Sequence, residues 1–294
     1  MRRIIICYYP GVHFINMYKV LAMEIKDRIA VITGAASGIG QAVSLELAAR
    51  GAKKVALVDM TERVFTIANE INQEAGRDVA VAYRGDVTSD EFRVSVFDEL
   101  QRNFGTPSIC VPAAGITRDD LAVRVDKETK QARIYPIENF KLVVDVNLIA
   151  PVYWGMETIA RIAEDRAKGN QKKWHANEGV QGTIIFIGSI SSQGNKGQVS
   201  YASTKAGLEG AASTLTKEAI FHGVRCGVIH PGFTDTPMVR AMGEEYIEAN
   251  VLPDTQLGRL IRPIEIADAI CFMISNSVVS GQLWADAGWH PSPA

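Results

Sequence analysis

The feature that most constrains the fold is a glycine-rich turn that joins a short apolar segment to a helical pattern near the start of the sequence. Residues 29–32 read Ile-Ala-Val-Ile, residues 33–40 read Thr-Gly-Ala-Ala-Ser-Gly-Ile-Gly, and apolar residues at helical spacing follow up to Gly51. Strand and helix patterns alternate from Arg28 onward, which predicts a mostly parallel sheet with helices on both faces. We therefore expect one three-layer, doubly wound α/β domain of about seven strands over residues 23–294.

The same turn is a candidate phosphate site, because glycines let backbone N–H groups approach an anion at the positive end of the following helix. The next apolar segment, 54–58, ends in Asp59, 25 residues after Gly34. Dinucleotide-binding folds place the acid that binds the ribose hydroxyls at this distance. A carboxylate there repels a 2′-phosphate and no arginine directly follows it, so the expected cofactor is NAD rather than NADP. An unrelated N-cap aspartate is the alternative interpretation of Asp59.

A second stretch carries residues suited to proton transfer. The apolar run 183–187 predicts a buried strand that ends at Gly188-Ser189, and after eleven more residues Tyr201 and Lys205 open a helix. Residues four apart share one helix face. A free tyrosine has a pKa of about 10, and a lysine ammonium one turn away favours the phenolate and lowers that pKa. Taken alone, the pair can also be an amphipathic helix start followed by a solvated lysine.

The intervening pattern predicts helices at about 62–75 and up to about 103, and strands at 79–83 and 108–111. Residues 88–91, Thr-Ser-Asp-Glu, predict a capping box at the start of the second helix. Asp86-Val87 ends a strand at a place where adenine can lie, and the small residues of 112–115 let the backbone lie beside a cofactor. Polar residues 116–136 predict a hairpin over the substrate mouth, and 168–181 predict a surface loop. Asn147 lies within a helix after an apolar stretch and needs a hydrogen-bond partner.

Composition excludes several classes of protein. The chain has 294 residues, 47% of them hydrophobic, and its net charge of −2 provides no basic surface for nucleic acid. Four cysteines and five histidines lack metal-ligand spacing, and no apolar run reaches the length of a membrane span. We expect a cytoplasmic protein with reduced thiols, no metal, and no nucleic-acid or membrane partner. Residues 1–22 are either a peripheral extension or an over-long gene start upstream of Met23, and we favour the second.

Taken together, these residues resemble the classical short-chain dehydrogenase/reductase family over roughly residues 23–289. The set of motifs is specific although no single member is. Within the family the chain is most similar to the 3-oxoacyl-(acyl-carrier-protein or CoA) reductase branch, through segments 115–119, 194–198 and 258–260. The resemblance implies a Rossmann fold. The matching motifs, in family order, are Thr33-Gly34-x-x-x-Gly38-x-Gly40, Asp86, Asn147, Ser189, Tyr201-x-x-x-Lys205 and the segment 231–236.

The resemblance also implies a role for each matched residue. Tyr201 is expected to be the general acid/base, and Lys205 to lower its pKa and bind the nicotinamide ribose. Ser189 is expected to orient the substrate oxygen, and Asn147 to hold a water in a proton relay. No metal ligand is implied. The implied cofactor-binding set is Gly34, Ser37, Gly38, Ile39 and Gly40 at the pyrophosphate, Asp59 at the adenosine ribose, Asp86 and Val87 near adenine, Ala114 and Gly115 beside the cofactor, Tyr201 and Lys205, and Pro231, Gly232, Thr234 and Thr236 over the nicotinamide.

Four features depart from the family pattern. Residues 112–115 read Pro-Ala-Ala-Gly in place of Asn-Asn-Ala-Gly, so an asparagine that braces the sheet is missing, and we expect this to cost stability rather than chemistry. The interval from Ser189 to Tyr201 is one residue shorter than the family norm, and Ser191 is the fallback for the serine. The excursions near 124–136 and 168–181 are longer than usual, and the tail at 277–282 is shortened.

The leading hypothesis is an NAD(H)-dependent oxidoreductase that interconverts a secondary alcohol and a ketone, as a 3-oxoacyl thioester reductase or 3-hydroxyacyl dehydrogenase. Polyols, sugars and hydroxysteroids are alternative substrates, because the pocket walls come from variable regions. The rival from another class is a non-catalytic dinucleotide-binding sensor, and the intact set of Asn147, Ser189, Tyr201 and Lys205 argues against it. The resemblance also implies a homo-oligomer, either a tetramer or a dimer.

Overall fold

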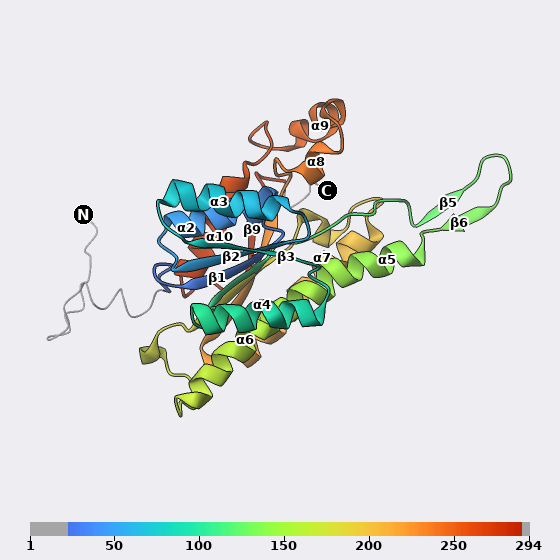
Figure 1. The fold of residues 1–294 in the computed structure, drawn as a ribbon. Helices are drawn as coiled ribbons and strands as arrows, with labels where there is room; N and C mark the ends of the chain where they lie inside the picture. The colour runs from blue at the N-terminus through green and yellow to red at the C-terminus, as the bar shows by residue number, and fades with distance from the viewer. Residues whose placement is uncertain (1–22, 290–294) are drawn as a thin grey trace, which may run out of the picture.

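A seven-stranded parallel sheet lies at the centre of the computed structural model, which describes residues 23–289 (Figure 1). The first strand in the sequence lies in the interior of the sheet, so the chain winds first to one side of it and then to the other. Such a reversal opens a crevice at the carboxyl ends of the strands. The strands lie in the order β3 (Ala80–Arg84), β2 (Lys54–Asp59), β1 (Ile29–Thr33), β4 (Ile109–Pro112), β7 (Gly182–Ile187), β8 (Val224–Pro231) and β9 (Gly281–Ala285).

Helices cover both faces of this sheet, as the alternating sequence pattern predicts (Figure 1). Because the central strands are covered on both faces, they are nearly continuous apolar runs, and every residue of β1 and β7 is buried. The three-layer α/β architecture expected from the sequence is confirmed. One face carries α2 (Gly38–Ala49), α3 (Arg63–Ala75) and α10 (Pro263–Ser275), and the other carries α4 (Asp90–Asn103), α6 (Ala150–Lys168) and α7 (Val199–Ala219).

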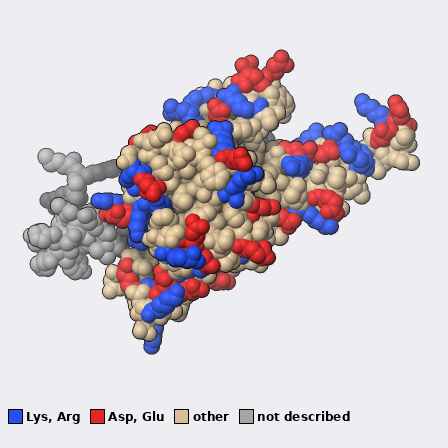
Figure 2. Space-filling view, in the orientation of Figure 1, with Lys and Arg blue, Asp and Glu red and all other residues tan. Residues whose placement is uncertain are grey.

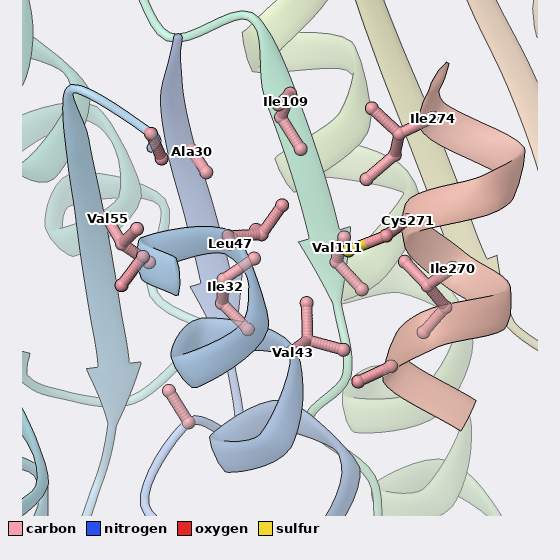
Figure 3. Close-up of a cluster of buried hydrophobic side chains, with 14 of the residues drawn as sticks. Ala30, Ile32, Val43, Leu47, Val55, Ile109, Val111, Ile270, Cys271 and Ile274 are labelled. Carbon is pink, nitrogen blue, oxygen red and sulfur yellow. The ribbon is translucent and has the colours of Figure 1, made fainter. Parts of the chain in front are cut away.

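The core on the α2 side is built from branched side chains of the sheet and of two neighbouring helices. Figure 3 shows Ile32 of β1 and Val111 of β4 among side chains from α2 and α10. Leu47 and Ile270, one from each helix, are both fully buried there. This packing fixes the start of α2, and therefore the glycine-rich turn, against the carboxyl end of β1.

A single helical run continues from α5 (Ile137–Val144) through one π-helical turn (Asp145–Ile149) into α6. The joined run, Ile137–Lys168, is long and apolar enough to be a candidate membrane span by length and composition alone, which differs from our expectation of no such run. The expectation failed because it treated the segments separately. Part of the run belongs to the core, since Trp154 and Thr158 of α6 are fully buried against the sheet.

The hairpin predicted within residues 116–136 is present. β5 (Val123–Val125) pairs antiparallel with β6 (Ala132–Ile134), and Figure 1 shows the two strands projecting away from the sheet. All of their residues are exposed, so the hairpin has no core face that could hold it against the body. Its base is tied down by Tyr135, whose hydroxyl donates to the carbonyl of Arg118 and contacts Ser200 Oγ at 3.0 Å.

The capping box predicted at 88–91 is also wrong in detail. α4 begins at Asp90, its N-cap is Ser89, and Ser89 Oγ accepts from the N–H of Phe92 at 3.2 Å. The cap lies one residue later than predicted, so Glu91 accepts from the Ser89 hydroxyl at 3.1 Å instead of closing a box.

The remaining expectations concern the surface and the chain ends. The segment 168–181 is a surface excursion, as predicted, with one short 3₁₀ turn at Ala176–Glu178. Positive and negative side chains are interspersed over the face that Figure 2 shows. The prediction for residues 1–22 lies outside the described residues.

Candidate active site

A cleft of about 630 Å³ lies at the carboxyl ends of the parallel strands, where the topology predicts a ligand site. Residues that are far apart in the sequence meet in its wall: the turn after β1, the ends of β2 and β3, the segment after β4, and the start of α7. Of the residues predicted for the site, those that line the cleft are Gly34, Ser37, Gly38, Ile39, Gly40, Asp59, Asp86, Val87, Ala114, Gly115, Tyr201, Lys205 and Thr236.

The glycine-rich turn is shaped by steric need. Gly34 and Gly38 have left-handed φ values of 65° and 56°. A Cβ at Gly34 would lie 2.8 Å from the Cα of Ala114, and a Cβ at Gly40 would collide with the carbonyl oxygen of Gly34. Ser37 is the N-cap of α2, and its side chain makes no capping hydrogen bond. The turn therefore presents the amino end of a helix to the cleft without a side chain over it, which is the donor arrangement that a pyrophosphate requires.

Asp59 stands beside this turn at the end of β2. Its carboxylate accepts from the N–H of Ala36 at 3.1 Å and from both the N–H and the hydroxyl of Thr61, at 3.0 and 2.9 Å. The next residues that line the cleft are Met60 and Thr61, and neither carries a positive charge. This end of the cleft suits two ribose hydroxyls better than a 2′-phosphate.

Hydrogen bonds hold the Asp86-Val87 segment and the segment after β4 in place. Asp86 accepts from the N–H and the hydroxyl of Thr88, at 2.9 and 2.8 Å. The indole of Trp154, a residue that sequence inspection did not select, donates to the carbonyl of Val87 at 2.9 Å. Within the unusual Pro-Ala-Ala-Gly segment, the N–H of Ala114 donates to Thr33 Oγ1 at 3.1 Å. A side chain of β1 therefore braces the segment where the family asparagine is missing.

Tyr201 and Lys205 lie one helical turn apart at the start of α7, as predicted. Lys205 is buried, its Nζ donates to the carbonyl of Ile187 at 2.7 Å, and the same atom lies 5.4 Å from the centre of the Tyr201 ring. Burial lowers the pKa of Lys205 to about 8. Burial also raises the pKa of Tyr201 to about 12, against an opposing hydrogen bond from Ser189. The predicted lowering of the tyrosine pKa is therefore wrong for the protein without cofactor, because loss of hydration, together with the negative charge of Asp119, outweighs the hydrogen bond from Ser189.

Ser189 lies directly after β7 and meets Tyr201 through a side-chain hydrogen bond, although it does not line the cleft itself. Its Oγ also accepts from the N–H of Ser191 at 3.0 Å. These contacts favour Ser189 over Ser191 as the serine of the site, and they are made despite the shortened interval to Tyr201. The backbone of Ser189 rests on the imidazole of His230, which sequence inspection also missed.

Asn147 has the buried partner that the sequence predicts. Its Oδ1 accepts from the N–H of Ile116 at 2.9 Å, and its Nδ2 donates to the carbonyl of the same residue at 2.8 Å. It lies in the π-helical turn between α5 and α6, a rare feature that is frequent at functional sites. The amide keeps one further donor and one further acceptor position beside Gly115.

The segment after β8 meets the expectation only in part. Thr236 lines the cleft, and its side chain caps α8 (Pro237–Arg240) by accepting from the N–H of Val239. Pro231 and Thr234 are buried, and Gly232 packs against the backbone of Asp286. Pro231, Gly232 and Thr234 shape the segment from behind and do not line the cleft.

Several residues that line the cleft were not predicted. Leu142 and Val146 come from the α5 helix and the π-helical turn, and Met238 comes from α8. Arg118 belongs to the excursion after β4 and is exposed. The apolar pattern of the helix gave no signal for Leu142 and Val146, because the same spacing also predicts core residues.

Metal chemistry finds no support within residues 23–289, which contain no group of three or more His, Cys, Asp or Glu side chains placed to hold an ion. The glycine-rich turn, the uncapped start of α2 and the carboxylate of Asp59 fit a dinucleotide at one end of the cleft. The serine, tyrosine and lysine at the other end can exchange a proton with an oxygen atom.

Known proteins resemble this chain in both sequence and fold. A family model described as enoyl-(acyl carrier protein) reductase matches residues 34–290. The chain is 32% identical to the 3-oxoacyl-[acyl-carrier-protein] reductase FabG of Escherichia coli K12 and 34% identical to FabG of Pseudomonas aeruginosa, in each case over 86% of this chain and 92% of the relative. It is 32% identical to the (3R)-3-hydroxyacyl-CoA dehydrogenase of Mus musculus, over the same shares. The crystal structure of gox2181 matches with a TM-score of 0.74 and 25% identity, over 93% of this chain and 98% of that one.

Proposed function

Because the chain belongs to the short-chain dehydrogenase/reductase family, and is thus an oxidoreductase that acts on CH–OH groups, we propose that it interconverts a 3-oxoacyl thioester and the corresponding 3-hydroxyacyl thioester with NAD(H). The observation that carries the proposal is the meeting of Ser189, Tyr201 and Lys205 beside a glycine cradle at one cleft. The bacterial relatives are named for 3-oxoacyl groups on acyl carrier protein and the mouse relative for 3-hydroxyacyl-CoA, and both kinds of substrate are acyl thioesters.

The cofactor half of the proposal rests on the fit of the cleft. The turn from Gly34 to Gly40 would hold the pyrophosphate, and Asp59 would bind the adenosine ribose. When bound, the nicotinamide supplies or accepts the hydride. The carboxylate of Asp59 and the uncharged neighbours Met60 and Thr61 favour NAD over NADP.

The proton half of the proposal rests on Tyr201. A pKa raised to about 12 keeps the phenol protonated near neutral pH, so in the reduction Tyr201 Oη donates its proton to the substrate oxygen. Ser189 Oγ donates a hydrogen bond to the same oxygen and orients it. Lys205 is mostly protonated at pH 7, because its pKa is about 8, and its ammonium stabilises the phenolate left behind. In the oxidation the same proton moves in the opposite direction.

The substrate end of the cleft supports an acyl group. Leu142, Val146 and Met238 are apolar residues of the cleft lining, and they come from the helices around the cleft rather than from the glycine cradle. The hydroxyls of a polyol or a sugar would find no hydrogen-bond partners on these three side chains. Hydroxysteroids remain an alternative that the same apolar lining would accept.

The proposal is tested by a steady-state screen of NAD⁺ and NADP⁺ against 3-hydroxyacyl-CoA esters, polyols, sugars and hydroxysteroids, followed by absorbance of the reduced cofactor. We expect turnover with NAD⁺ and the 3-hydroxyacyl esters. Tyr201→Phe should lower kcat by at least about a thousandfold and leave the Kd for NADH unchanged, because only the proton donor is lost. Turnover with another class alone would replace the substrate assignment. NADH binding without turnover of any substrate would favour the sensor.

We further propose that the enzyme acts in the cytoplasm as a homo-oligomer. Cys110, Cys226 and Cys271 are free, buried thiols, as expected in a reducing compartment. Two neighbouring helices, α6 and α7, expose apolar and small side chains that a second copy could cover.

A further inference from the structure

The backbone of Ser189 contacts the buried imidazole of His230, which has no part in the proton steps above. His230, the penultimate residue of β8, is fully buried, and its Nδ1 lies 3.2 Å from the backbone N and 3.1 Å from the backbone O of Ser189. A Cβ at Gly188 would collide with the same ring, so the glycine before the serine makes room for the imidazole. The indole of Trp284 on β9 stacks on the imidazole, with the two ring centroids 4.2 Å apart and an interplanar angle of 15°.

These contacts distinguish the two neutral tautomers of His230. When Nδ1 lacks a proton, it accepts the hydrogen bond from the N–H of Ser189. When Nδ1 carries the proton, it donates to the carbonyl of Ser189 or to Ser192 Oγ, which lies 3.4 Å away, and in either case the buried N–H of Ser189 loses its acceptor. A buried donor without a partner is costly, so the first tautomer holds the Ser189 peptide more firmly.

Glu209 favours the same tautomer from the other side of the ring. Its Oε1 lies 3.7 Å from Nε2 of His230, and its Oε2 accepts from Gln282 Nε2 at 3.0 Å. A carboxylate facing Nε2 draws the imidazole proton to that nitrogen and leaves Nδ1 as the acceptor. Glu209 lies on α7 one turn after Lys205 and two turns after Tyr201, so a single helix carries the proton donor and the carboxylate that orients the histidine.

We propose that Glu209 and His230 form a positioning pair that fixes the peptide of Ser189, and with it the direction of Ser189 Oγ toward Tyr201. The inference rests on the proposed function, in which Ser189 orients the substrate oxygen. The contacts run from Glu209 through the two imidazole nitrogens of His230 to the backbone of Ser189, and from the Ser189 side chain to Tyr201. The pair touches neither substrate nor cofactor, and it acts only through the serine.

Steady-state kinetics of variants of the full-length protein test the inference. His230→Phe keeps an aromatic ring on Trp284 but removes the acceptor, and we expect kcat to fall about tenfold with the Kd for NADH unchanged. His230→Asn offers an amide oxygen near the position of Nδ1 and should recover at least about a third of wild-type kcat. Glu209→Leu should lower kcat about threefold, while Glu218→Leu, an exposed control on the same helix, should not change it.

Three results with the His230 variants would overturn the inference: kcat of a folded His230→Phe within twofold of wild type, no recovery with His230→Asn, or loss of NADH binding in parallel with kcat. Nitrogen chemical shifts of ¹⁵N-histidine-labelled protein provide a readout that needs no turnover, with the His230 signals assigned by their loss in His230→Asn. We expect a proton on Nε2 and none on Nδ1, and the reverse would overturn the inference. If the wild type turns over no 3-oxoacyl thioester, the proposed function fails, whereas the nitrogen shifts still decide the state of His230.

Discussion

Lys205 is a buried cation whose uncharged form is favoured by the fold. Burial lowers its pKa to about 8, against 10.5 in an exposed lysine. Between these pH values the unfolded chain binds more protons than the folded chain, so the contribution of Lys205 to the free energy of unfolding rises as pH rises through this window. Between pH 8 and pH 10, we expect the free energy of unfolding of the wild type to rise by about 2 kcal/mol relative to that of Lys205→Met.

Urea unfolding of both proteins without cofactor, at half-unit pH steps, measures this difference. The tyrosine Tyr201 is present in both proteins, so the ionisation of its unfolded form near pH 10 cancels in the difference between the two curves. Parallel curves of unfolding free energy against pH for wild type and Lys205→Met would show that Lys205 has an ordinary pKa.

Asp59 offers a second test at a single residue, because its charge and its hydrogen bonds can be separated. Ala36 and Thr61 donate to different oxygens of Asp59, so Asp59→Asn keeps an acceptor for one of them and removes the negative charge, whereas Asp59→Ala removes both acceptors and the charge. We expect the ratio of kcat/KM for NAD⁺ to that for NADP⁺ to fall about tenfold in both variants, because repulsion of the 2′-phosphate is lost. A ratio unchanged in both variants would mean that the ribose is recognised elsewhere.

Much of the site could be predicted from local sequence, and the rest depends on packing between distant elements. The glycines follow from the strand–turn–helix pattern of β1 and α2, Asp59 from its place at the end of the next strand, and Tyr201 and Lys205 from their four-residue spacing on one helix. The shift of the Tyr201 pKa could not be predicted, because the tyrosine loses its hydration to neighbours from other parts of the chain. His230 gave no signal either, since a lone histidine in an apolar strand is an ordinary core residue.

At the scale of elements, the hairpin β5–β6 is separable from the fold. All six of its strand residues are exposed, and the N–H of Tyr135 donates to the carbonyl of Ala122 at 2.9 Å, which closes the base of the excursion. Replacing residues 123–134 with two glycines should therefore change Tm by less than about 2 °C.

The matched control variant leaves the hairpin strands in place and removes a hydrogen-bonding group at the base of the hairpin. Tyr135→Phe loses the hydroxyl that contacts Arg118 and Ser200, and we expect it to lower the free energy of unfolding by about 1 kcal/mol. Thermal and urea unfolding measure both variants. A larger loss from removing the tip than from Tyr135→Phe would mean that the hairpin supports the fold.

The elements themselves follow closely from the sequence where burial is two-sided. β1, β2 and β7 are continuous apolar runs bounded by polar or glycine residues, and the predicted strands match them to within a residue at each end. The π-helical turn could not be predicted, because it accompanies the contact between Asn147 and Ile116, which are distant in the sequence. The direction of the hairpin was also beyond prediction, since no core face of its own constrains it.

At the scale of the whole molecule, the exposed faces of α6 and α7 bear on assembly. Tyr153 of α6 is 43% exposed and Ile149 just before it is 46% exposed, and α7 presents the exposed small residues Ser203, Ala206, Gly210 and Ser213 at helical spacing. Small residues along a helix let a second helix approach closely, and apolar neighbours gain from being covered. We therefore expect a particle of two or four times the 32.0 kDa of one chain.

Gly210→Glu tests this expectation with little risk to the protomer. A Cβ at Gly210 meets no atom within 4 Å, and glutamate favours a helix over glycine by up to about 1 kcal/mol, so the protomer should keep its fold. In the assembly, the added carboxylate would be buried against a second helix, and we expect light scattering coupled to size exclusion to show a shift toward 32.0 kDa at micromolar concentration. Gln73→Glu introduces the same charge on the exposed side of α3 and should leave the assembly intact. If Gly210→Glu has the mass of the wild-type oligomer, the subunits associate through another face. If the wild type itself has the mass of one chain, no second copy covers α6 and α7, and the expectation of a homo-oligomer is wrong.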